Sequence, residues 1–321
     1  MNKPMQRKVL SINKDIYIIG EEDFDPKHIF ENGQAFRWEE NQGEYTVVAN
    51  KYVIGVKKLN QEEIQKAIKG GLPLDLWNHE DLPVVRLRGA GTMEDYDTFW
   101  RHYFDMDRDY QALRKELSDI DDYLKASMDF ATGLRILKQD FFEMIISFII
   151  SANNNITRIK KSVAKLSEMC GEKIYDADSN VYYKFPTPEA IAELDTEELA
   201  RFTGVGYRAP YLIKTAQMIA NKEVDLDDIR QMHYEQAHRE LTLLSGVGPK
   251  VADCILLFGD SRDMAFPVDT WVIKVMNKYY LGEEKNNKKI KAEGLKRFGD
   301  KAGLAQQYLF YHARIHKVGS R

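Results

Sequence analysis

The pattern of hydrophobic and polar positions divides the chain into a strand-rich first part and a helical second part. Near the N-terminus, short stretches rich in β-branched and aromatic residues alternate with polar breaks, which is typical of strands. The tripeptide "NQG" at 41–43 is a plausible hairpin turn between two of these stretches. The strands expected from this pattern lie at 15–20, 33–40, 44–50, 51–59 and 82–89.

From residue 94 onward, hydrophobic residues recur at the spacing of an amphipathic helix. A sheet followed by helices is an α+β arrangement. We therefore predict an N-terminal antiparallel β-sheet domain with flanking helices at 1–125, followed by an all-α bundle at 126–321. The expected helices cover 94–104, 108–118, 140–151, 156–171, 188–194, 196–202, 207–222, 234–244, 249–259, 270–280 and 302–316.

Two segments of the helical part share one plan, a helix, the tripeptide Gly-Val-Gly and a second helix. They are "ELARFTGVGYRAPYLIKTA" (198–216) and "ELTLLSGVGPKVADCILLF" (240–258). A helix that starts after a tight glycine turn points free backbone N–H groups and its positive dipole end at an anion, such as a repeating phosphate. Gly246 and Gly248 are the candidate phosphate contacts. Two simple helix–turn–helix connections without a ligand remain the alternative.

A lysine and an aspartate stand at successive helix starts. Lys250 follows Pro249, and the positive helix end there favours the neutral amine, which is the nucleophilic form. Asp269 precedes the helix expected at 270–280 and is a good N-cap. An amine and a carboxylate suit nucleophilic substitution at a sugar C1′, where the carboxylate stabilises oxocarbenium character. A solvated lysine and a carboxylate that only caps its helix are the alternatives.

Composition narrows the class of protein. The net charge of −4 is not that of a general nucleic-acid binder, but residues 201–321 hold 20 Lys and Arg against 14 Asp and Glu. This local excess fits a binding face within an acidic protein. The two cysteines cannot build a disulfide framework or a four-cysteine cluster. With neither a signal peptide nor an apolar stretch long enough to span a bilayer, we expect a cytoplasmic protein without membrane contact.

These motifs resemble a known family. "LLSGVGPKVADC" followed by "PVDTW" resembles the helix-hairpin-helix DNA glycosylases, with the hairpin at 240–258, and the lysine at 250 resembles their bifunctional branch. Four further stretches resemble the 8-oxoguanine DNA glycosylase/lyases and extend the likeness over nearly the whole chain. They are "ENGQAFRW" (31–38), "ISANNNITRI" (150–159), "GVGYRAPYL" (204–212) and "AGLAQQYLF" (302–310).

The resemblance implies a base excision repair enzyme that acts on double-stranded DNA with 8-oxoguanine opposite cytosine. Lys250 would displace the base from C1′ and form a Schiff base, and β-elimination would then cut the strand. Asp269 would stabilise the transition state. The base must leave the helix for this chemistry. The resemblance then implies that the Gly33 carbonyl accepts N7–H, Gln306 reads the Watson–Crick edge, and Cys254 and Phe310 enclose the ring.

The resemblance also implies contacts to the DNA around the extruded base. Asn153 would fill the gap and read the orphan cytosine, helped by Arg158 and Arg208, with Tyr207 as a wedge. One departure concerns Trp271, which stands where the best-known eukaryotic members have a phosphate-contacting histidine. One backbone contact of the family is therefore in doubt here.

No cofactor is required by this interpretation, and no iron–sulfur cluster is expected. The family's hairpin holds a monovalent cation through backbone carbonyls, which the resemblance assigns to Thr242, Leu244 and Val247. We expect a monomer from a prokaryotic cytoplasm, associated with the nucleoid through DNA. Two alternatives stay open, namely a non-catalytic helix-hairpin-helix DNA-binding protein and a glycosylase for another lesion, such as adenine mispairs or alkylated purines.

Overall fold

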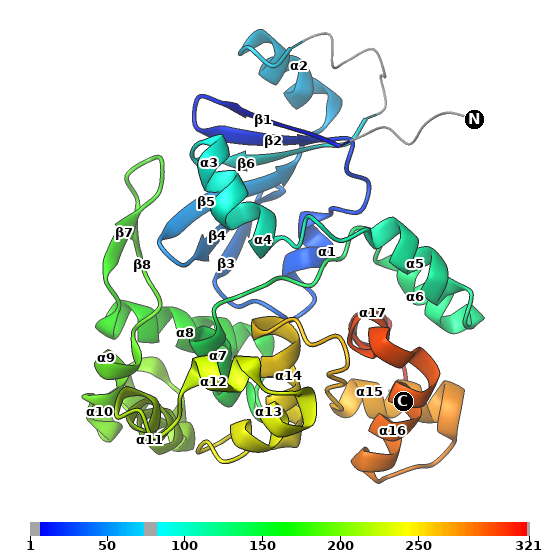
Figure 1. The fold of residues 1–321 in the computed structure, drawn as a ribbon. Helices are drawn as coiled ribbons and strands as arrows, with labels where there is room; N and C mark the ends of the chain where they lie inside the picture. The colour runs from blue at the N-terminus through cyan, green and yellow to red at the C-terminus, as the bar shows by residue number, and fades with distance from the viewer. Residues whose placement is uncertain (1–6, 74–81, 320–321) are drawn as a thin grey trace.

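A six-stranded antiparallel sheet forms the N-terminal region of the computed structural model, which describes residues 7–73 and 82–319 (Figure 1). The strands pair in the order β1-β2-β6-β5-β4-β3, and every neighbouring pair is antiparallel. The predicted α+β class is therefore confirmed. The strands are β1 (Lys8–Ile12), β2 (Asp15–Ile19), β3 (Trp38–Asn41), β4 (Glu44–Ala49), β5 (Tyr52–Lys58) and β6 (Val84–Arg88).

The sheet carries side chains of alternate residues into two separate hydrophobic clusters, as the two-residue period of a strand requires. Ile16 and Ile18 belong to the larger cluster, beside Trp100 and Phe104 of the helical segment after β6. Tyr17 and Ile19 belong to the smaller one, with Ile64 of α2 (Gln61–Lys69). The sheet is thus covered on both faces.

The turn predicted at 41–43 is present. β3 and β4 pair through Asn41 and Glu44, and both residues between them have positive φ, 52° at Gln42 and 79° at Gly43. Two positive φ values are those of a type I′ turn, which matches the twist of a hairpin. The strand expected at 33–40 is shorter than predicted, because regular pairing begins only at Trp38.

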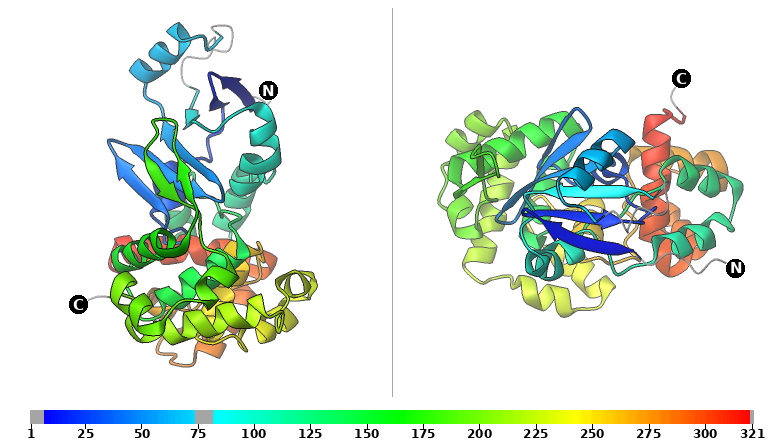
Figure 2. Two further views of the ribbon diagram at one scale, coloured as in Figure 1. Left: turned by 90° about the vertical axis from the view of Figure 1, so that its left-hand side faces the viewer. Right: turned by 90° about the horizontal axis from the view of Figure 1, so that it is seen from above.

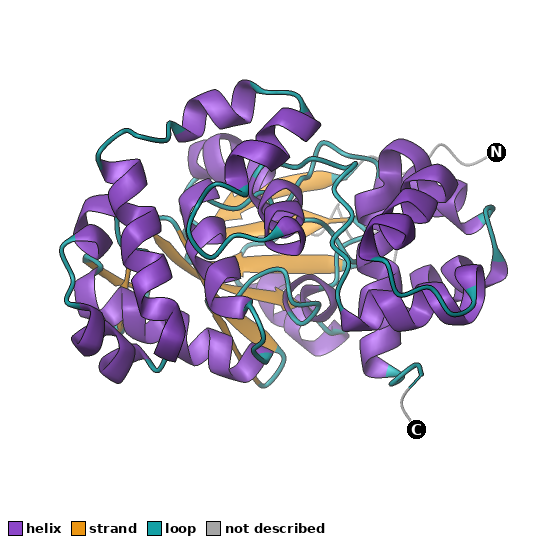
Figure 3. Ribbon diagram, turned by 90° about the horizontal axis from the view of Figure 1, so that it is seen from below, coloured by secondary structure: helices purple, strands orange, loops and turns teal. Residues whose placement is uncertain are grey.

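Helices make up most of the remaining chain, and those after residue 140, coloured green to red, lie below the sheet in Figure 1 and in the left view of Figure 2. Seen from below, they lie in front of the strands (Figure 3). The helices are α1 (Pro26–Phe30), α2, α3 (Met93–Asp95), η2 (Tyr96–Trp100), α4 (Arg101–Tyr103), α5 (Tyr110–Ser118), α6 (Asp122–Phe130), α7 (Phe141–Ser151), α8 (Ile156–Cys170), α9 (Pro188–Ala192), α10 (Thr196–Thr203), η3 (Gly206–Arg208), α11 (Ala209–Ala220), α12 (Leu226–Gln231), α13 (Tyr234–Leu241), α14 (Pro249–Gly259), α15 (Thr270–Met276), η4 (Asn277–Leu281), α16 (Asn287–Phe298), η5 (Gly299–Lys301) and α17 (Ala302–Ile315).

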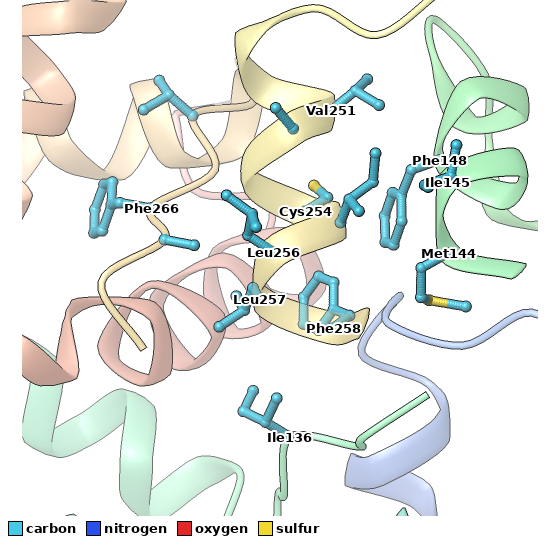
Figure 4. Close-up of a cluster of buried hydrophobic side chains, with 14 of the residues drawn as sticks. Ile136, Met144, Ile145, Phe148, Val251, Cys254, Leu256, Leu257, Phe258 and Phe266 are labelled. Carbon is cyan, nitrogen blue, oxygen red and sulfur yellow. The ribbon is translucent and has the colours of Figure 1, made fainter. Parts of the chain in front are cut away.

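Two helices, α7 and α14, form the centre of the helical core. Every residue from Phe141 to Ile150 is buried, as is every residue from Val251 to Gly259. A helix that is apolar on all sides belongs in the middle of a bundle. Figure 4 shows α14 with Cys254 and Phe258 on the side that faces Phe148 of α7. Among the described helices, none combines the length and apolarity that crossing a bilayer requires.

Several elements were not predicted from the sequence. They are β1, α1, α2, α6, α12, α16, η5 and the hairpin formed by β7 (Lys173–Tyr175) and β8 (Val181–Tyr183). The hairpin stands out at the left of Figure 1. The domain division at 125/126 stays a prediction. Helix α6 continues through that position, from Asp122 to Phe130.

Candidate active site

The predicted hairpin joins α13 to α14, and its glycines have separate tasks. Gly246 has a φ of 82°, which favours glycine, and a Cβ there would lie 2.9 Å from the Cβ of Tyr211 on α11. Gly248 is the extended N-cap of α14, with open space around it. Pro249 fills the first position of the helix, so Lys250 emerges in its first turn.

Lys250 opens onto a small cavity of about 70 Å³ between α7, α14, α17 and the loop before α15. All six residues to which the resemblance gives catalytic or base-pocket roles line it. The lining residues are Gly33, Phe148, Lys250, Cys254, Phe258, Pro267, Asp269, Gln306, Gln307 and Phe310. Larger hollows of about 310 and 720 Å³ lie elsewhere, but they hold neither Lys250 nor Asp269. The roles of these residues stay predictions, whereas their convergence is an observation.

Asp269 both caps α15 and faces the cavity. Its Oδ1 accepts hydrogen bonds from the N–H groups of Trp271, at 3.0 Å, and Val272, at 2.8 Å. Burial raises the pKa of Asp269, while those two N–H groups and the positive charges of Lys250 and Arg314 oppose the rise. A carboxylate held this way can face a developing cation without moving.

The walls of the cavity are aromatic and sulfur-containing. Cys254 is buried, and burial raises the pKa of its thiol to about 11, against the opposing effect of the nearby Lys250. The side chain is therefore a neutral thiol near pH 7. Phe148 stacks on Phe258 at 5.5 Å between ring centroids, and the Nζ of Lys250 lies 5.6 Å from the Phe148 ring. Neutral and aromatic walls suit a flat, uncharged ring.

Gln306 presents an unpaired acceptor. Its side-chain Nε2 donates to the carbonyl of Pro267 at 3.1 Å, and because a carbonyl can only accept, this bond fixes the orientation of the amide. Its Oε1 is buried and has no hydrogen-bond partner among the described residues. A buried acceptor without a partner costs stability unless a ligand supplies a donor.

The loop that carries Gly33 is held by buried amides. Gln34 donates from Nε2 to the carbonyls of Ile29, at 2.8 Å, and Arg135, at 2.7 Å. Its Oε1 accepts from the N–H of Leu137 at 2.8 Å. Gly33 itself has a φ of 88°, and no described donor reaches its carbonyl. The loop is thus rigid around an available acceptor.

A second cluster surrounds Asn153 at the loop between α7 and α8. Asn153 is exposed with a φ of 49°. The guanidinium of Arg208 donates from Nη2 to the Asn153 carbonyl at 3.0 Å and from Nε to the Ala152 carbonyl at 2.9 Å. It also lies 4.4 Å from the ring of Tyr207, whose side chain is 58% exposed. The structure therefore joins three of the four residues predicted at the orphan base.

Arg158 is the fourth. It lies exposed in the first turn of α8, and among the described residues its side chain has no hydrogen bond to the other three. It follows Asn153 by five residues along the chain, and its role at the orphan base stays a prediction. In the hairpin, the Leu244 carbonyl accepts a hydrogen bond from the N–H of Val247 at 3.2 Å. A monovalent cation held by the carbonyls of Thr242, Leu244 and Val247 stays a prediction.

Trp271 lies beside Lys274, whose Nζ is 4.5 Å from the centre of the indole ring. The backbone N–H of Trp271 donates to Asp269, and its side chain offers one indole N–H donor but, unlike a protonated histidine, no positive charge for a phosphate. Across the described residues, no group of three or more His, Cys, Asp and Glu side chains gathers to bind a metal.

The chain matches two known protein families, one over its N-terminal part and one over its helical part. Residues 16–145 match the model for the 8-oxoguanine DNA glycosylase N-terminal domain. Residues 146–299 match the model for HhH-GPD superfamily base excision DNA repair proteins. The chain belongs to the 8-oxoguanine DNA glycosylase family of that superfamily. Membership makes it a DNA glycosylase with AP lyase activity.

Relatives of this glycosylase span archaea, yeast and bacteria. A probable N-glycosylase/DNA lyase of Methanothermobacter thermautotrophicus is 35% identical over 66% of this chain and 73% of its own. The N-glycosylase/DNA lyase of Saccharomyces cerevisiae is 31% identical over 88% of this chain and 81% of its own. The 8-oxoguanine glycosylase/lyase of Clostridium acetobutylicum, solved with DNA containing cytosine opposite 8-oxoguanine, is 38% identical, covers 97% of this chain and 99% of its own, and superposes with a TM-score of 0.86.

Some lining residues of the glycosylase pocket escaped the sequence analysis. Phe148, Phe258 and Pro267 read as ordinary core residues, and only the tertiary structure brings them to Lys250. Gln307 donates to the Asn32 carbonyl at 3.0 Å and so ties α17 to the Gly33 loop. A signal was present for this helix, because Gln306 and Gln307 lie four and three residues before Phe310 and therefore share its side of the helix.

Proposed function

We propose that this glycosylase removes 8-oxoguanine paired with cytosine through a Schiff base at Lys250 and then cuts the DNA strand by β-elimination. The observation that carries the proposal is one cavity in which Lys250 and Asp269 lie beside a neutral, aromatic slot with an unpaired amide oxygen at its end. The lesion and the opposite base in the proposal are those printed for the Clostridium acetobutylicum relative.

In the proposed reaction, the neutral Nζ of Lys250 forms a bond to C1′, and the bond from C1′ to the base breaks with its electron pair leaving on the base. The base takes up a proton. The bond from C1′ to the ring oxygen then breaks, the oxygen takes up a proton, and C1′ becomes an iminium carbon bonded to Lys250. Loss of a C2′ proton then breaks the bond from C3′ to oxygen and expels the 3′ phosphate. Asp269 stabilises the positive charge that develops on the sugar as the base leaves.

Discrimination against normal guanine follows from an acceptor at the Gly33 loop. The oxidised base carries a hydrogen on N7, whereas guanine has a bare acceptor there. The carbonyl oxygen of Gly33 can accept that hydrogen. In normal guanine, the same oxygen would face the lone pair of N7, and two acceptors repel each other. At the other edge of the base, the Oε1 of Gln306 can accept from a ring N–H or an exocyclic amine.

The cytosine preference is assigned to the cluster at Asn153. Arg208 fixes the two carbonyls of that loop, and Tyr207 is exposed beside it as a wedge. Arg158 is exposed on the next helical turn and can donate to a base edge. A monomeric state, a cytoplasmic prokaryotic setting and a structural monovalent cation at the hairpin belong to the same proposal.

Borohydride trapping on an 8-oxoguanine·cytosine duplex tests the central claim. Reduction of a Schiff base joins enzyme and DNA covalently, so a shifted protein–DNA band should form with the unaltered protein and not with Lys250→Gln. Parallel duplexes carry an alkylated purine or a mispaired adenine. If one of those is processed while 8-oxoguanine stays uncut, the lesion assignment is wrong. A non-catalytic binding protein would give no covalent band with any duplex.

A further inference from the structure

Two buried, unpaired polar atoms lie on the same face of α17. One is the Oε1 of Gln306 and the other is the Nη1 of Arg314, and neither has a hydrogen-bond partner among the described residues. Phe310 lies midway between them in the sequence. Positions 306, 310 and 314 follow one another at intervals of four residues, so their side chains form one stripe along the helix.

Arg314 lies against the wall and loop that form the base pocket. The centre of its guanidinium is 5.3 Å from the centre of the Phe310 ring. Its Nη2 donates to the Glu31 carbonyl, two residues before Gly33. A Cβ built on Gly33 would lie 3.3 Å from Nη1 and 3.5 Å from the Phe310 ring. The unpaired N–H of Arg314 therefore lies where Phe310 meets the Gly33 loop.

The two unpaired atoms differ in chemistry. Gln306 offers an acceptor at one end of the Phe310 face, while the guanidinium of Arg314 can only donate at the other. A flat ring lying on Phe310 would pair with both atoms if it had a donor on one edge and an acceptor on the opposite edge. 8-Oxoguanine has this arrangement, with N–H groups on its Watson–Crick edge and the added oxygen at C8. Guanine carries only a C8 hydrogen at that place.

We propose that Arg314 reads the C8 oxygen of the flipped base, as a second specificity residue beside Gly33. This inference rests on the proposed function. N7 and C8 are neighbouring ring atoms, which fits the contact between Arg314 and Gly33. One side of the pocket thus offers an acceptor for N7–H and a donor for the C8 oxygen, and guanine satisfies neither.

The cavity of about 70 Å³ must widen to admit a purine, and the residues at its edge can provide the movement. Arg314 is held to the Glu31 carbonyl by one nitrogen only, and its other contacts are stacking contacts with Phe310 and Tyr311. A guanidinium can slide over a ring face while remaining charged. Its charge also remains available when the base is bound.

The test compares two ligands that differ only in the base. Dissociation constants are measured for duplexes carrying either 8-oxoguanine or a tetrahydrofuran abasic analogue opposite cytosine, in a Lys250→Gln background that blocks turnover. Arg314→Met, which keeps much of the side-chain bulk, should weaken binding of the 8-oxoguanine duplex by about tenfold, as expected for a lost hydrogen bond to a charged donor. Binding of the abasic duplex should not change.

Arg297→Met is the matched control, because Arg297 lies 4.8 Å over the Tyr280 ring in a similar stacking contact, while its Nη2 donates to Glu293 of the same helix. It should leave the ratio of the two constants unaltered. Equal weakening of both ligands by Arg314→Met, or no weakening of either, would overturn the inference. If Arg314→Met does not fold, Arg314→Lys serves instead, and an unchanged ratio in that variant overturns it as well.

A cleavage assay distinguishes a wrong proposed function from a wrong role of Arg314. The unaltered protein is assayed for cleavage of the same 8-oxoguanine duplex. An inactive protein would contradict the proposed function, whereas full activity combined with an unchanged ratio in the Arg314 variants would contradict only the reading of the C8 oxygen.

Discussion

The two Gly-Val-Gly segments share a sequence plan, but the residues two positions after the second glycine lie in different environments. Counting from the glycines, Arg208 of the first segment corresponds to Lys250 of the second. Arg208 is 7% exposed, and its guanidinium binds carbonyls of the Asn153 loop. Lys250 is half-buried at a cavity with an aspartate and a thiol. One position thus holds a planar guanidinium and the other a primary amine on a flexible stem.

The turns differ too. In the first segment, Gly204 and Gly206 have φ values of 72° and 58°, and a Cβ at either would meet open space. In the second, Gly246 packs onto Tyr211, and the Oγ1 of Thr215 donates to the Ser245 carbonyl at 2.9 Å. Both contacts come from α11, the helix that follows the first turn. The comparison indicates that the first hairpin serves as the support against which the second is aligned.

The largest expected loss of activity comes from placing the arginine of the first segment at position 250 of the second. Lys250→Arg keeps a positive charge but removes the nucleophile, so strand cleavage should fall by about 10³-fold or more, as it should in Lys250→Gln. Binding of an 8-oxoguanine duplex should persist in Lys250→Gln. Single-turnover cleavage and binding assays measure both. Cleavage at the normal rate by Lys250→Arg would contradict the proposed role of the lysine.

The glycines of the two turns give the next prediction. Gly246→Ala combines a left-handed backbone with a clash against Tyr211, and we expect it to lower the free energy of unfolding by about 3 kcal/mol. Gly204→Ala carries only the backbone strain, for which we expect about 1–2 kcal/mol. Urea unfolding measures both. Equal losses would mean that the packing of the second hairpin onto α11 contributes nothing.

Some parts of the fold could be predicted from the sequence, and others could not. The turn at Gln42–Gly43, most strands of the large sheet and the core helices α7 and α14 were predicted because their signals are local. The segment at 33–37 was predicted as part of a strand because the stretch at 33–40 is short, contains aromatic residues and is bounded by polar breaks. It is a loop because Gln34 bonds to Arg135 and Leu137, partners about a hundred residues away that no local pattern reveals.

The candidate site shows the same limit. Lys250, Asp269 and Gln306 were found through motifs, but their meeting in one cavity is a tertiary fact. Arg314 carries no motif, and its importance appears only when its unpaired nitrogen is seen beside Gly33. Elements as short as β7 and β8, with 3 residues each, lack the periodicity needed for a prediction.

The pH dependence of the reaction rate should distinguish Asp269, the N-cap of α15 that faces the cavity, from an N-cap aspartate elsewhere in the fold. Burial raises the pKa of Asp269 above that of an exposed aspartate, and only its ionised form stabilises a cation. As pH falls through that raised pKa, the rate of base release should drop by about tenfold per pH unit. Asp269→Asn keeps a capping oxygen and should remove this acid limb along with most of the activity.

Asp195, which caps α10 in the first region by accepting from Glu197 and Glu198, is the control for this experiment. It is exposed, so Asp195→Asn should leave the pH profile unaltered. An acid limb that moved in Asp195→Asn, or that persisted unchanged in Asp269→Asn, would assign the ionisation to another group. Rate measurements at saturating enzyme over the acid range decide between these outcomes.

The smallest expected effect concerns the choice of the opposite base. Arg158→Ala removes an exposed donor, so the preference for cytosine over the other three bases should fall by about fivefold to tenfold while the stability of the fold stays unchanged. Arg208→Ala should reduce the same preference by releasing the Asn153 loop, and because Arg208 is buried and bonded it should also lower the free energy of unfolding. Cleavage of four duplexes that differ only opposite the lesion, together with urea unfolding, measures both quantities. If Arg158→Ala left the discrimination intact while Arg208→Ala abolished it, the cytosine would be read through the loop held by the first hairpin and not by a direct contact from α8.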